Sequence, residues 1–557
     1  MGSLRFDAST VRWEDGAVGH DPSAFPELEA VDWSGASVLA YEDRPSSIDE
    51  LFRNAVDRSP DREAVAFPGP DVRLTYRELA DRVDAVAAGL QAQGIGAGDH
   101  VMIHLTNVPE FVESFFACAR IGAVSMPTNT RLTSRELSYL LGDADPSAVI
   151  SEPSFEGDLA EADHALDPDR AFVVGGSDRY SEYGTLSGHD SELVDPVESE
   201  ETDPATLMYT SGTTGHPKGC LASHFNMVNG ALNYQATYET GDGLRSLVTV
   251  PLFHGTGLLA NTLHTVANAG TTVVLEGYDP ETFLETIERE DVEFVIAVPT
   301  NYILATEKAD PSEYDLSSWR IGAYGGAPMP STVVSRIRES FPDLALCNAY
   351  GTTETVAGLA TTCPDEYTDE YAHTVGLPTA PIELKVIDED RTPLGPGEVG
   401  ELAIRGPIIV DRYLNKPEKT AAAFEDGWHY TGDLASIDED GFVELKGRNR
   451  DLIVRGGENI YALDVEEALV TSGKVIEASV TSFPDEVLGE RVLAAVVPKD
   501  GVRLTEADLE DVCEEQLADY KHPDVFRILD ELPKNPNGKV IKGELLTEPL
   551  EFGIRAG

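Results

Sequence analysis

Basic residues are scarce in this chain of 557 residues, which has 41 lysines and arginines against 99 aspartates and glutamates. The formal net charge of −58 would repel nucleic acid and anionic lipid, so neither is expected as a partner. The acidic residues are spread along the chain and form no acidic tail or compact cation-binding block. We therefore expect a halophilic protein, because concentrated salt screens the self-repulsion of such a surface.

Cysteine is rare as well, and the chain has no long hydrophobic run. The five cysteines are widely spaced without a CxxC pair, which argues against a disulfide framework or a zinc site. They are Cys118, Cys220, Cys347, Cys363 and Cys513. No apolar run approaches the roughly 18 residues of a membrane-spanning helix, and residues 1–50 lack the basic and apolar parts of a signal peptide. We expect a cytoplasmic protein without integral membrane association.

Several common catalytic motifs are missing. The chain has no GxxxxGK[ST] loop, no GxSxG elbow and no HExxH helix, which argues against a P-loop nucleotidase, an α/β-hydrolase and a zinc protease of that type. The glycines of residues 94–98 (GIGAG) follow a helical pattern rather than a strand, so they do not form a dinucleotide fingerprint.

The hydrophobic pattern predicts layered α/β structure in the first part of the chain. Helices are expected to start near residues 47–52 and at Thr75, whose side chain forms a capping box with Glu78. Residues 101–105 read as a buried strand, and helical and strand patterns then alternate to about residue 299, which favours parallel sheets. The first fifty residues show little periodicity, and we expect them to be a loosely packed leader.

The second part of the chain changes character. Short β-type runs separated by Gly, Pro and Asp turns over residues 376–446 predict a small antiparallel barrel or sheet. A smaller α+β unit follows, with helices at 463–470 and 506–517 and a strand at 493–497. We predict two domains: residues 1–449, with layered α/β subdomains plus the barrel-like part, and residues 450–557.

One loop is rich in phosphate-binding residue types. A short apolar strand, residues 206–209, runs into residues 210–219 (TSGTTGHPKG), and a helical pattern follows at 223–234. Glycines let backbone N–H groups converge on an anion, hydroxyls add donors, and lysine adds a point charge. The candidate phosphate ligands are Thr210, Ser211, Gly212, Thr213, Thr214, Gly215 and Lys218. Lys218 is the first lysine of the chain, although an ordinary Gly/Thr-rich hairpin loop remains the alternative.

Seven further segments follow this loop in the order found in one known family. They are residues 251–254 (PLFH), 325–328 (GGAP), 350–354 (YGTTE), 430–433 (YTGD), 447–448 (GR), 456–460 (GGENI) and 533–539 (PKNPNGK). With the loop, they resemble the adenylate-forming (ANL) superfamily, which contains acyl-CoA synthetases, peptide-synthetase adenylation domains and luciferases. The resemblance runs from about residue 70 to 545.

The resemblance implies a nucleotide site in the middle of the chain. Gly325, Gly326 and Ala327 would line the adenine and acyl pocket, where small residues leave room for a ligand. From the family, Tyr350 would hold adenine, Thr353 the α-phosphate and Glu354 the Mg²⁺ ion, for which a carboxylate is a suitable hard ligand.

Asp433 would accept hydrogen bonds from the ribose hydroxyls, with help from Arg448. Each of these residues also has a structural reading. Tyr350 can be a core aromatic, Glu354 an acid at a helix start, and Asp433 a turn aspartate that caps its own backbone.

The resemblance also implies the catalytic residues and a moving domain. His254 would close the carboxylate site or orient the adenylate, and Lys539 would place a positive charge between the attacking carboxylate and the α-phosphate. After the first step the C-terminal domain would rotate, with Gly456 and Gly457 lining the tunnel of the thiol. Arg450 stands at the hinge position, where relatives usually have Asp or Lys.

Taken together, the motifs predict an enzyme, an AMP-forming acid–thiol ligase that uses ATP, Mg²⁺ and coenzyme A. We expect the acid to be a medium- or long-chain fatty acid, because no charged residue is placed to bind a second carboxylate. An aryl or short-chain acid is the alternative. A stand-alone adenylation enzyme that loads a carrier protein, and a non-catalytic nucleotide-binding homologue, are further alternatives. We expect a monomer or a homodimer.

Overall fold

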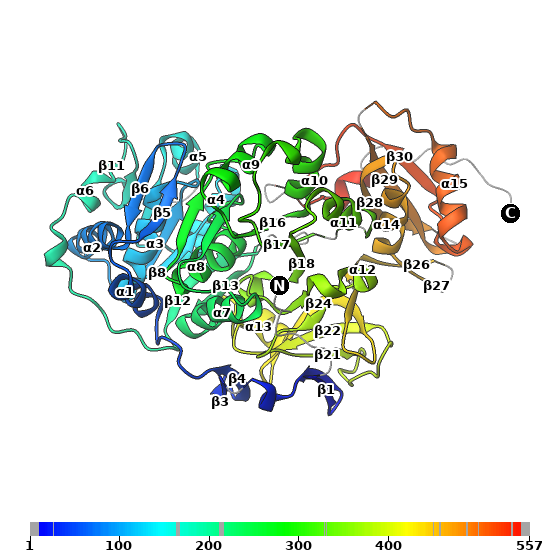
Figure 1. Ribbon diagram of the computed structural model, residues 1–557, viewed down its shortest axis with the longest axis horizontal. Helices are drawn as coiled ribbons and strands as arrows, with labels where there is room; N and C mark the ends of the chain where they lie inside the picture. The colour runs from blue at the N-terminus through cyan, green and yellow to red at the C-terminus, as the bar shows by residue number, and fades with distance from the viewer. Residues whose placement is uncertain are drawn as a thin grey trace.

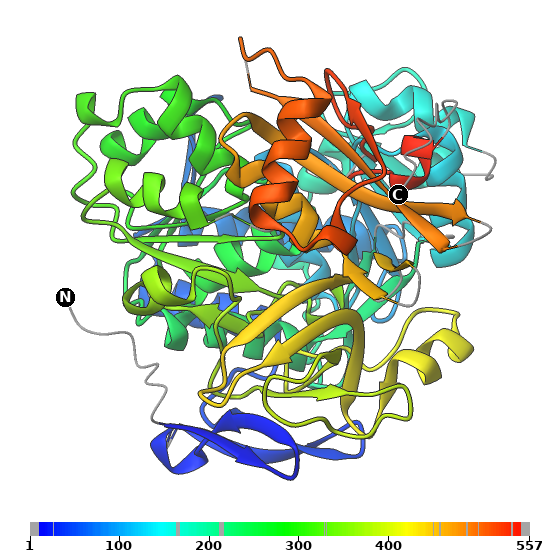
Figure 2. The same cartoon turned by 90° about the vertical axis from the view of Figure 1, so that its right-hand side faces the viewer.

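The structure is a computed structural model. It describes residues 10–546 except 26, 163–166, 211–216, 328, 330, 449–450, 456–457, 486–487, 500 and 536–538. The α/β class and the large and small parts expected from the sequence are confirmed. Figures 1 and 2 show the small C-terminal part (orange to red) above the antiparallel sheet around β21, β22 and β24 (yellow).

Two mainly parallel sheets form the large part. The first has the order β11-β10-β9-β7-β8-β12-β13, and its pairings are parallel apart from the β12–β13 hairpin. Its strands are β7 (His100–His104), β8 (Val124–Pro127), β9 (Ala148–Ser151), β10 (Ala171–Val173), β11 (Ser181–Glu182), β12 (Pro204–Tyr209) and β13 (Gly219–Ser223).

The second sheet has the order β20-β19-β18-β17-β16-β14-β15-β5-β6, with antiparallel pairs only at its two ends. Its strands are β5 (Glu63–Phe67), β6 (Val72–Thr75), β14 (Arg245–Val248), β15 (Thr271–Val274), β16 (Phe294–Ala297), β17 (Ile321–Gly325), β18 (Ala345–Tyr350), β19 (Thr361–Cys363) and β20 (Leu377–Pro378).

Helices accompany the strands of both sheets. They are α1 (Ile48–Arg58), α2 (Tyr76–Ala92), α3 (Pro109–Arg120), α4 (Ser134–Ala144), α5 (Glu156–Glu161), α6 (Gly184–Ser187), α7 (His224–Thr237), α8 (His264–Ala267), α9 (Pro280–Arg289), α10 (Pro299–Lys308), α11 (Ser331–Ser340) and α12 (Thr368–Tyr371). The expected caps are present: Ser47 accepts from the Glu50 N–H, and Thr75 and Glu78 form the capping box. Apolar side chains from both sheets and from helices α1 to α3 and α7 share one buried core.

The third sheet is antiparallel, as the short β-type runs predict. It contains β1 (Val11–Glu14), β2 (Ala17–His20), β21 (Glu383–Ile387), β22 (Gly400–Arg405), β23 (Phe424–Glu425), β24 (Trp428–Ile437) and β25 (Val443–Arg448), and α13 (Pro417–Ala423) precedes β23.

The expected loose leader is wrong. The β1–β2 hairpin joins the third sheet through β21, where Val18 is fully buried. The hairpin of β3 (Leu28–Trp33) and β4 (Ala36–Tyr41) stacks the Trp33 ring on Phe225 of α7. These strands are only four to six residues long, so their alternation is too short to stand out as periodicity in the sequence.

The C-terminal part has its own sheet and core. It contains β26 (Leu452–Arg455), β27 (Glu458–Tyr461), β28 (Val475–Asp485), β29 (Gly489–Pro498) and β30 (Val525–Ile528), with helices α14 (Ala462–Thr471) and α15 (Glu506–Gln516). The change of sheet falls between β25 and β26. The domain boundary at residues 449 and 450 stays a prediction, because both residues lie outside the described part. Within that part, no helix is both long and apolar enough to cross a membrane.

Candidate active site

The base of the predicted phosphate loop is closed by backbone contacts. Strands β12 and β13 pair Tyr209 with Gly219, the Thr210 N–H donates to the Lys218 carbonyl at 2.9 Å, and the Lys218 N–H donates to Thr210 Oγ1 at 3.3 Å. Ser211, Gly212, Thr213, Thr214 and Gly215 lie outside the described residues, so their part in phosphate binding stays a prediction. The β12–β13 hairpin nevertheless fixes the position of the Lys218 backbone at the end of the loop.

Lys218 belongs to a three-residue group with Tyr413 and Glu354. Its Nζ donates to Tyr413 Oη at 2.8 Å and lies 4.0 Å from the centre of the tyrosine ring. Tyr413 Oη donates in turn to Glu354 Oε1 at 2.7 Å, and Lys218 Nζ is 3.8 Å from the same carboxylate oxygen. The loop lysine and the predicted metal ligand are therefore held in one network.

A second group, again of a tyrosine, a carboxylate and a cationic side chain, contains Asp433, the residue predicted to bind the ribose. Tyr350 Oη, at the carboxyl end of β18, donates to Asp433 Oδ2 at 2.6 Å. Arg448 Nε lies 2.6 Å from Asp433 Oδ1, and Arg448 also donates to the Thr431 carbonyl at 3.1 Å. The structure thus joins three predicted site residues from β18, β24 and β25.

The two carboxyl groups differ in their acidity. Burial raises the pKa of Glu354, but His429, the Tyr413 hydroxyl and Lys218 together outweigh burial, so the net pKa is lowered. Burial also raises the pKa of Asp433, and the opposing effects of Arg448 and Tyr350 do not cancel it. Glu354 is therefore the more firmly ionised of the two.

A cavity of about 310 Å³ connects these groups, and cationic side chains outnumber carboxylates in its wall. The charged lining residues are Lys218, Arg391, Lys419, Arg448, Glu354 and Glu401. A cavity with surplus positive charge in a chain of net charge −58 is suited to a polyanion such as a nucleotide phosphate chain.

Two buried polar atoms, one in the cavity wall and one in the segment that leads to Glu354, have no hydrogen-bond partner among the described residues. They are Nε2 of His429, which lines the cavity, and Oγ1 of Thr352, two residues before Glu354. Unpartnered buried polar atoms are rare and indicate an unseen ligand or water. A buried ionised carboxylate beside a cationic cavity also fits a hard divalent ion that accompanies phosphate. The residues present therefore fit a magnesium–nucleotide complex.

The glycines at the end of β17 serve two different purposes. A Cβ at Gly325 would collide with the Ala349 carbonyl of the neighbouring strand, so packing alone requires this glycine. Gly326 has φ +79° and almost open space where its Cβ would be, and Ala327 is exposed. Packing thus explains Gly325 without a ligand, whereas open space lies beside Gly326, and the part of all three residues in the adenine and acyl pocket stays a prediction. Thr353 begins the short 3₁₀ turn Thr353–Thr355 that carries Glu354.

The positive charge of Lys539 acts on His254 although 285 positions separate the two residues in the sequence. Burial, followed by the positive charges of Lys539 and Arg131, lowers the pKa of His254 to about 4. Lys539 is exposed, and its backbone N–H donates to Asn535 Oδ1 at 2.9 Å. The imidazole is therefore neutral at pH 7, and the lysine of the C-terminal part lies near it.

Three residues predicted to act with the moving domain, Arg450, Gly456 and Gly457, lie outside the described residues. Their parts in the hinge and in the thiol tunnel stay predictions. Helix α14 lies against the preceding sheet, since a Cβ at Gly447 would be 3.9 Å from Leu463 Cβ.

Sequence reasoning missed Tyr413 and His429. Tyr413 lies in the segment DRYLNKP, outside the eight quoted motifs, and nothing in a single sequence connects it with residues 218 and 354. His429 stands directly before the YTGD motif and is 2% exposed. A histidine among the apolar residues of a strand was the available signal, although such a histidine is usually structural.

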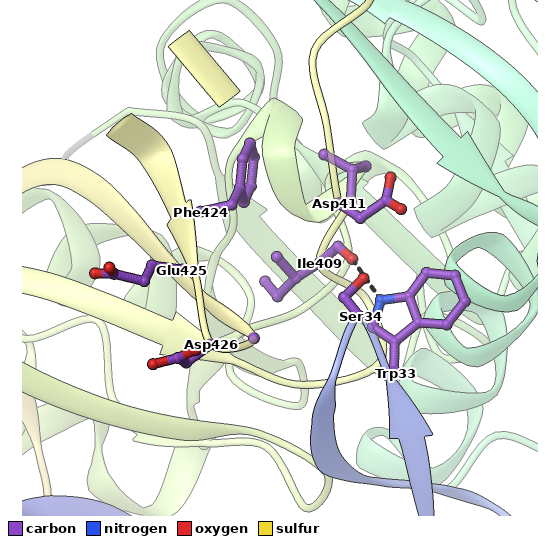
Figure 3. Close-up of a pocket in the computed structure, with 9 residues that line it drawn as sticks. Trp33, Ser34, Ile409, Asp411, Phe424, Glu425 and Asp426 are labelled. Carbon is purple, nitrogen blue, oxygen red and sulfur yellow. Dashed lines mark hydrogen bonds between the residues drawn. The ribbon is translucent and has the colours of Figure 1, made fainter. Parts of the chain in front are cut away.

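A second cavity, of about 320 Å³, contains none of the predicted site residues. It lies between the β3–β4 hairpin and the segments around residues 409–411 and 424–427, and is lined by Trp33, Ile409, Phe424 and several acidic side chains (Figure 3). Trp33 donates to the Ile409 carbonyl at 3.3 Å, which ties the hairpin to the large part. We assign this cavity no chemistry.

Comparisons with known proteins agree with the motifs. The family of AMP-binding enzymes matches residues 52–414, and the C-terminal domain of AMP-binding enzymes matches residues 464–539. The putative acyl-CoA synthetase YngI of Bacillus subtilis is 32% identical over 91% of this chain and 98% of that protein, and a feruloyl-CoA synthase of Amycolatopsis is 36% identical over 87% and 96%.

A solved structure shares the arrangement of most of the chain. O-succinylbenzoate CoA synthetase of Bacillus subtilis, in complex with its acyl-adenylate intermediate, is 29% identical, with a TM-score of 0.81 over 90% of this chain and 99% of that one. The matched families, the relatives and the geometry of the site agree, and the chain belongs to the family of AMP-binding enzymes.

Proposed function

We propose that this enzyme is an AMP-forming acyl-CoA ligase that uses ATP, Mg²⁺ and coenzyme A. The observation that carries the proposal is the cationic cavity lined by Lys218, Glu354 and Arg448, the last of which pairs with Asp433. The family relationship and the acyl-CoA synthetases among the relatives support the same reaction.

In the first half-reaction, a carboxylate oxygen of the acid attacks the α-phosphorus of ATP. The bond from this phosphorus to the bridging oxygen breaks, and pyrophosphate leaves. Lys218 and the loop hold the leaving group, Thr353 donates to the α-phosphate, and Lys539 neutralises the charge that develops there. Tyr350 and Asp433 hold the nucleoside. Bound at Glu354, Mg²⁺ would supply positive charge to the phosphate oxygens.

In the second half-reaction, the thiol sulfur of coenzyme A attacks the acyl carbon of the mixed anhydride. The thiol loses its proton, the bond from the acyl carbon to the phosphate oxygen breaks, and AMP leaves. The C-terminal domain rotates between the two steps about Arg450, which moves Lys539 away and brings Gly456 and Gly457 to the tunnel. His254, neutral at pH 7, orients the adenylate rather than acting as a base.

The acid is proposed to be a fatty acid of medium or long chain. Gly255 and Gly257 do not report on the size of the acid, because packing already requires both glycines: a Cβ would collide with Ala357 at Gly255 and with the Pro251 carbonyl at Gly257. An aryl acid is the second candidate, favoured by the relatives named feruloyl-CoA synthase and indoleacetate–CoA ligase.

A screen of acids in molar KCl tests the function. Fatty acids from four to eighteen carbons, ferulate and indoleacetate are each offered with ATP and coenzyme A, and AMP release is measured. AMP release that requires an acid and coenzyme A supports the ligase. Pyrophosphate exchange without any use of coenzyme A, together with loading of a carrier protein, would support the stand-alone adenylation enzyme instead.

We also propose adaptation to high salt, based on the net charge of −58. The melting temperature is expected to rise between low salt and molar KCl, because screening removes repulsion among surface carboxylates. A melting temperature that does not change over this range would contradict the adaptation. We further propose a cytoplasmic location, in keeping with five free, buried cysteines, and a monomeric or homodimeric state.

A further inference from the structure

Tyr413 stands between the two charged groups that would meet the phosphates and the metal ion. Its Oη accepts a hydrogen bond from Lys218 and donates one to Glu354, at 2.8 and 2.7 Å. The lysine and the carboxylate are 3.8 Å apart, which is beyond hydrogen-bond distance. The hydroxyl therefore replaces a direct hydrogen bond between the two charges.

The fold places Tyr413 here through its backbone. Residues 412–414 run beside β13, where the Leu221 N–H donates to the Arg412 carbonyl, Cys220 bridges to Tyr413, and the Leu414 N–H donates to the Gly219 carbonyl. Three residues earlier, the Val410 N–H donates to the Glu354 carbonyl at 3.0 Å. The segment of residues 410–414 thus joins the base of the phosphate loop to the turn that carries Glu354.

The contacts of Glu354 are one-sided. Both Tyr413 and Lys218 approach Oε1, and no other side chain among the described residues donates a hydrogen bond to this carboxylate. The side chain is 14% exposed and borders the cavity, so the second oxygen is available to a ligand. Oriented through one oxygen, the carboxylate is prepared to bind a cation through the other.

We propose that Tyr413 is a positioning residue that holds the Lys218–Glu354 ion pair open at 3.8 Å, so that no direct hydrogen bond forms between them and both groups stay ready for the magnesium–nucleotide complex. This inference rests on the proposed function, because it assumes that Glu354 takes the metal ion and Lys218 the phosphates. Without the hydroxyl, the ammonium and carboxylate groups close on each other, and binding of the complex must first separate them.

The variant Tyr413→Phe tests this inference. It keeps the ring that faces the Lys218 ammonium and packs on Phe424, and it removes only the hydroxyl. ATP binding is measured by calorimetry without an acid substrate, across a titration of Mg²⁺. Because a hydrogen bond to a charged group is lost, the Mg²⁺ concentration for half-maximal ATP binding is expected to rise about tenfold. Thioester formation from preformed acyl-adenylate and coenzyme A is expected to change less than about twofold, since neither pyrophosphate nor Mg²⁺ takes part in it.

The chain offers a matched control in its core. Tyr183 Oη donates to Glu113 Oε2 at 3.1 Å, and Arg82 pairs with Glu113 Oε1 at 2.9 Å, so this is again a tyrosine, a carboxylate and a cation. Tyr183 directly precedes α6, far from β18 and β24 in Figure 1. Tyr183→Phe is expected to lower the melting temperature and to leave the Mg²⁺ titration unchanged.

The outcomes separate positioning from simple support of the fold. An Mg²⁺ titration of Tyr413→Phe equal to that of the wild type, or a shift matched by Tyr183→Phe, overturns the inference. A second variant, Lys218→Met, covers a Tyr413→Phe protein that does not fold. This variant removes the lysine from the pair, so it should weaken ATP binding in the absence of Mg²⁺. The Mg²⁺ concentration for half-maximal ATP binding should not rise, because no ammonium group remains to close on Glu354. A rise in that concentration overturns the inference.

The ligase assignment and the positioning role of Tyr413 can be overturned by different results. If no acid gives AMP release while Tyr413→Phe still shifts the Mg²⁺ titration, the positioning role stands and the ligase assignment falls. A wild-type protein that binds no magnesium–ATP complex overturns both.

Discussion

The active site contains two groups built from the same three parts, a tyrosine, a carboxylate and a cation. In one, Tyr413 and Lys218 surround Glu354, and in the other Tyr350 and Arg448 surround Asp433. The hydrogen bonds from the tyrosines to the carboxylates differ by only 0.1 Å, at 2.7 and 2.6 Å. The pKa is nevertheless lowered at Glu354 and raised at Asp433.

The surroundings explain the difference. Burial raises the pKa of both carboxyl groups, but beside Glu354 the contributions of His429, Tyr413 and Lys218 exceed it. Asp433 has lowering contributions from Arg448, Tyr350 and His429, while the negative charge of Glu354 acts in the opposite direction. Similar partners therefore do not give a carboxylate a fixed ionisation, because burial and the sign of more distant charges contribute as well. A firmly ionised Glu354 suits a cation, whereas Asp433 suits neutral hydroxyls.

The largest effect is expected for a residue outside both groups. Lys539→Ala should slow adenylate formation by about 10²- to 10³-fold, because it removes a charge that acts mainly in the transition state. Thioester formation from preformed acyl-adenylate should stay near the wild-type rate. Rapid-quench measurement of each half-reaction separates the two steps. Equal rates in both half-reactions for variant and wild type would contradict the assigned role.

A second lysine of the same C-terminal hairpin serves as control. Lys534 pairs with Glu477 at 2.8 Å on the surface. Lys534→Ala is expected to change either half-reaction by less than about twofold, because exposed ion pairs contribute little.

Removing the charge of Glu354 or of Asp433 tests whether the two carboxylates have different roles. Glu354→Gln should slow adenylate formation by about a hundredfold and raise the Mg²⁺ requirement, because the amide still accepts from Tyr413 but binds a cation poorly. Asp433→Asn should raise the KM for ATP by about tenfold without changing the Mg²⁺ requirement. Steady-state kinetics at several Mg²⁺ concentrations measures both. A similar Mg²⁺ dependence in the two variants would remove the distinction between the groups.

Much of the second group could be predicted from the sequence, whereas the first could be predicted only in part. Tyr350, Asp433 and Arg448 each lie in a short motif with a recognisable family pattern, and the fold brings the three side chains together, although the sequence did not indicate the hydrogen bond from Tyr350 to Asp433. Tyr413 lies in a segment that none of the eight quoted motifs covers. Its role depends on the segment of residues 410–414, which runs beside β13. Tyr413 there contacts Cys220 and Lys218, which lie nearly two hundred positions earlier in the sequence.

In the fold, too, features that depend on neighbouring residues could be predicted from the sequence, whereas features that depend on distant residues could not. Capping residues such as Ser47 and Thr75 predict helix starts from chemistry within four positions, and those helices are present. The β1–β4 hairpins were missed, because their burial depends on strand β21 and on Phe225, far along the chain. Gly325 was assigned to a ligand although the adjacent strand already requires it, since a sequence does not show which backbone passes beside a glycine.

A smaller effect is expected at the tyrosine of the second group. Tyr350→Phe keeps the ring for the adenine base and removes one donor to Asp433, whose other oxygen remains paired with Arg448. The KM for ATP should rise about three- to tenfold, and the Mg²⁺ requirement should stay constant. Kinetics of pyrophosphate exchange at varied ATP and Mg²⁺ tests this. A shift in the Mg²⁺ requirement as large as that expected for Tyr413→Phe would show that the two tyrosines do not have separate roles.

The smallest effect concerns His254, a third titratable group near the reacting atoms. Its pKa in the folded protein is about 4, against 6.5 for an ordinary histidine, so the unfolded chain binds more protons than the folded protein between these values. The stability that the neutral imidazole contributes is complete above about pH 6.5 and is lost as the pH falls towards 4. The melting temperature of His254→Gln should therefore fall less than that of the wild type between pH 7 and pH 4.5. Over pH 6 to 8 the wild-type rate of adenylate formation should show no inflection from this histidine. An acid limb near pH 6.5 that disappears in His254→Gln would mean that the imidazole titrates normally and that neither burial nor the charge of Lys539 lowers its pKa.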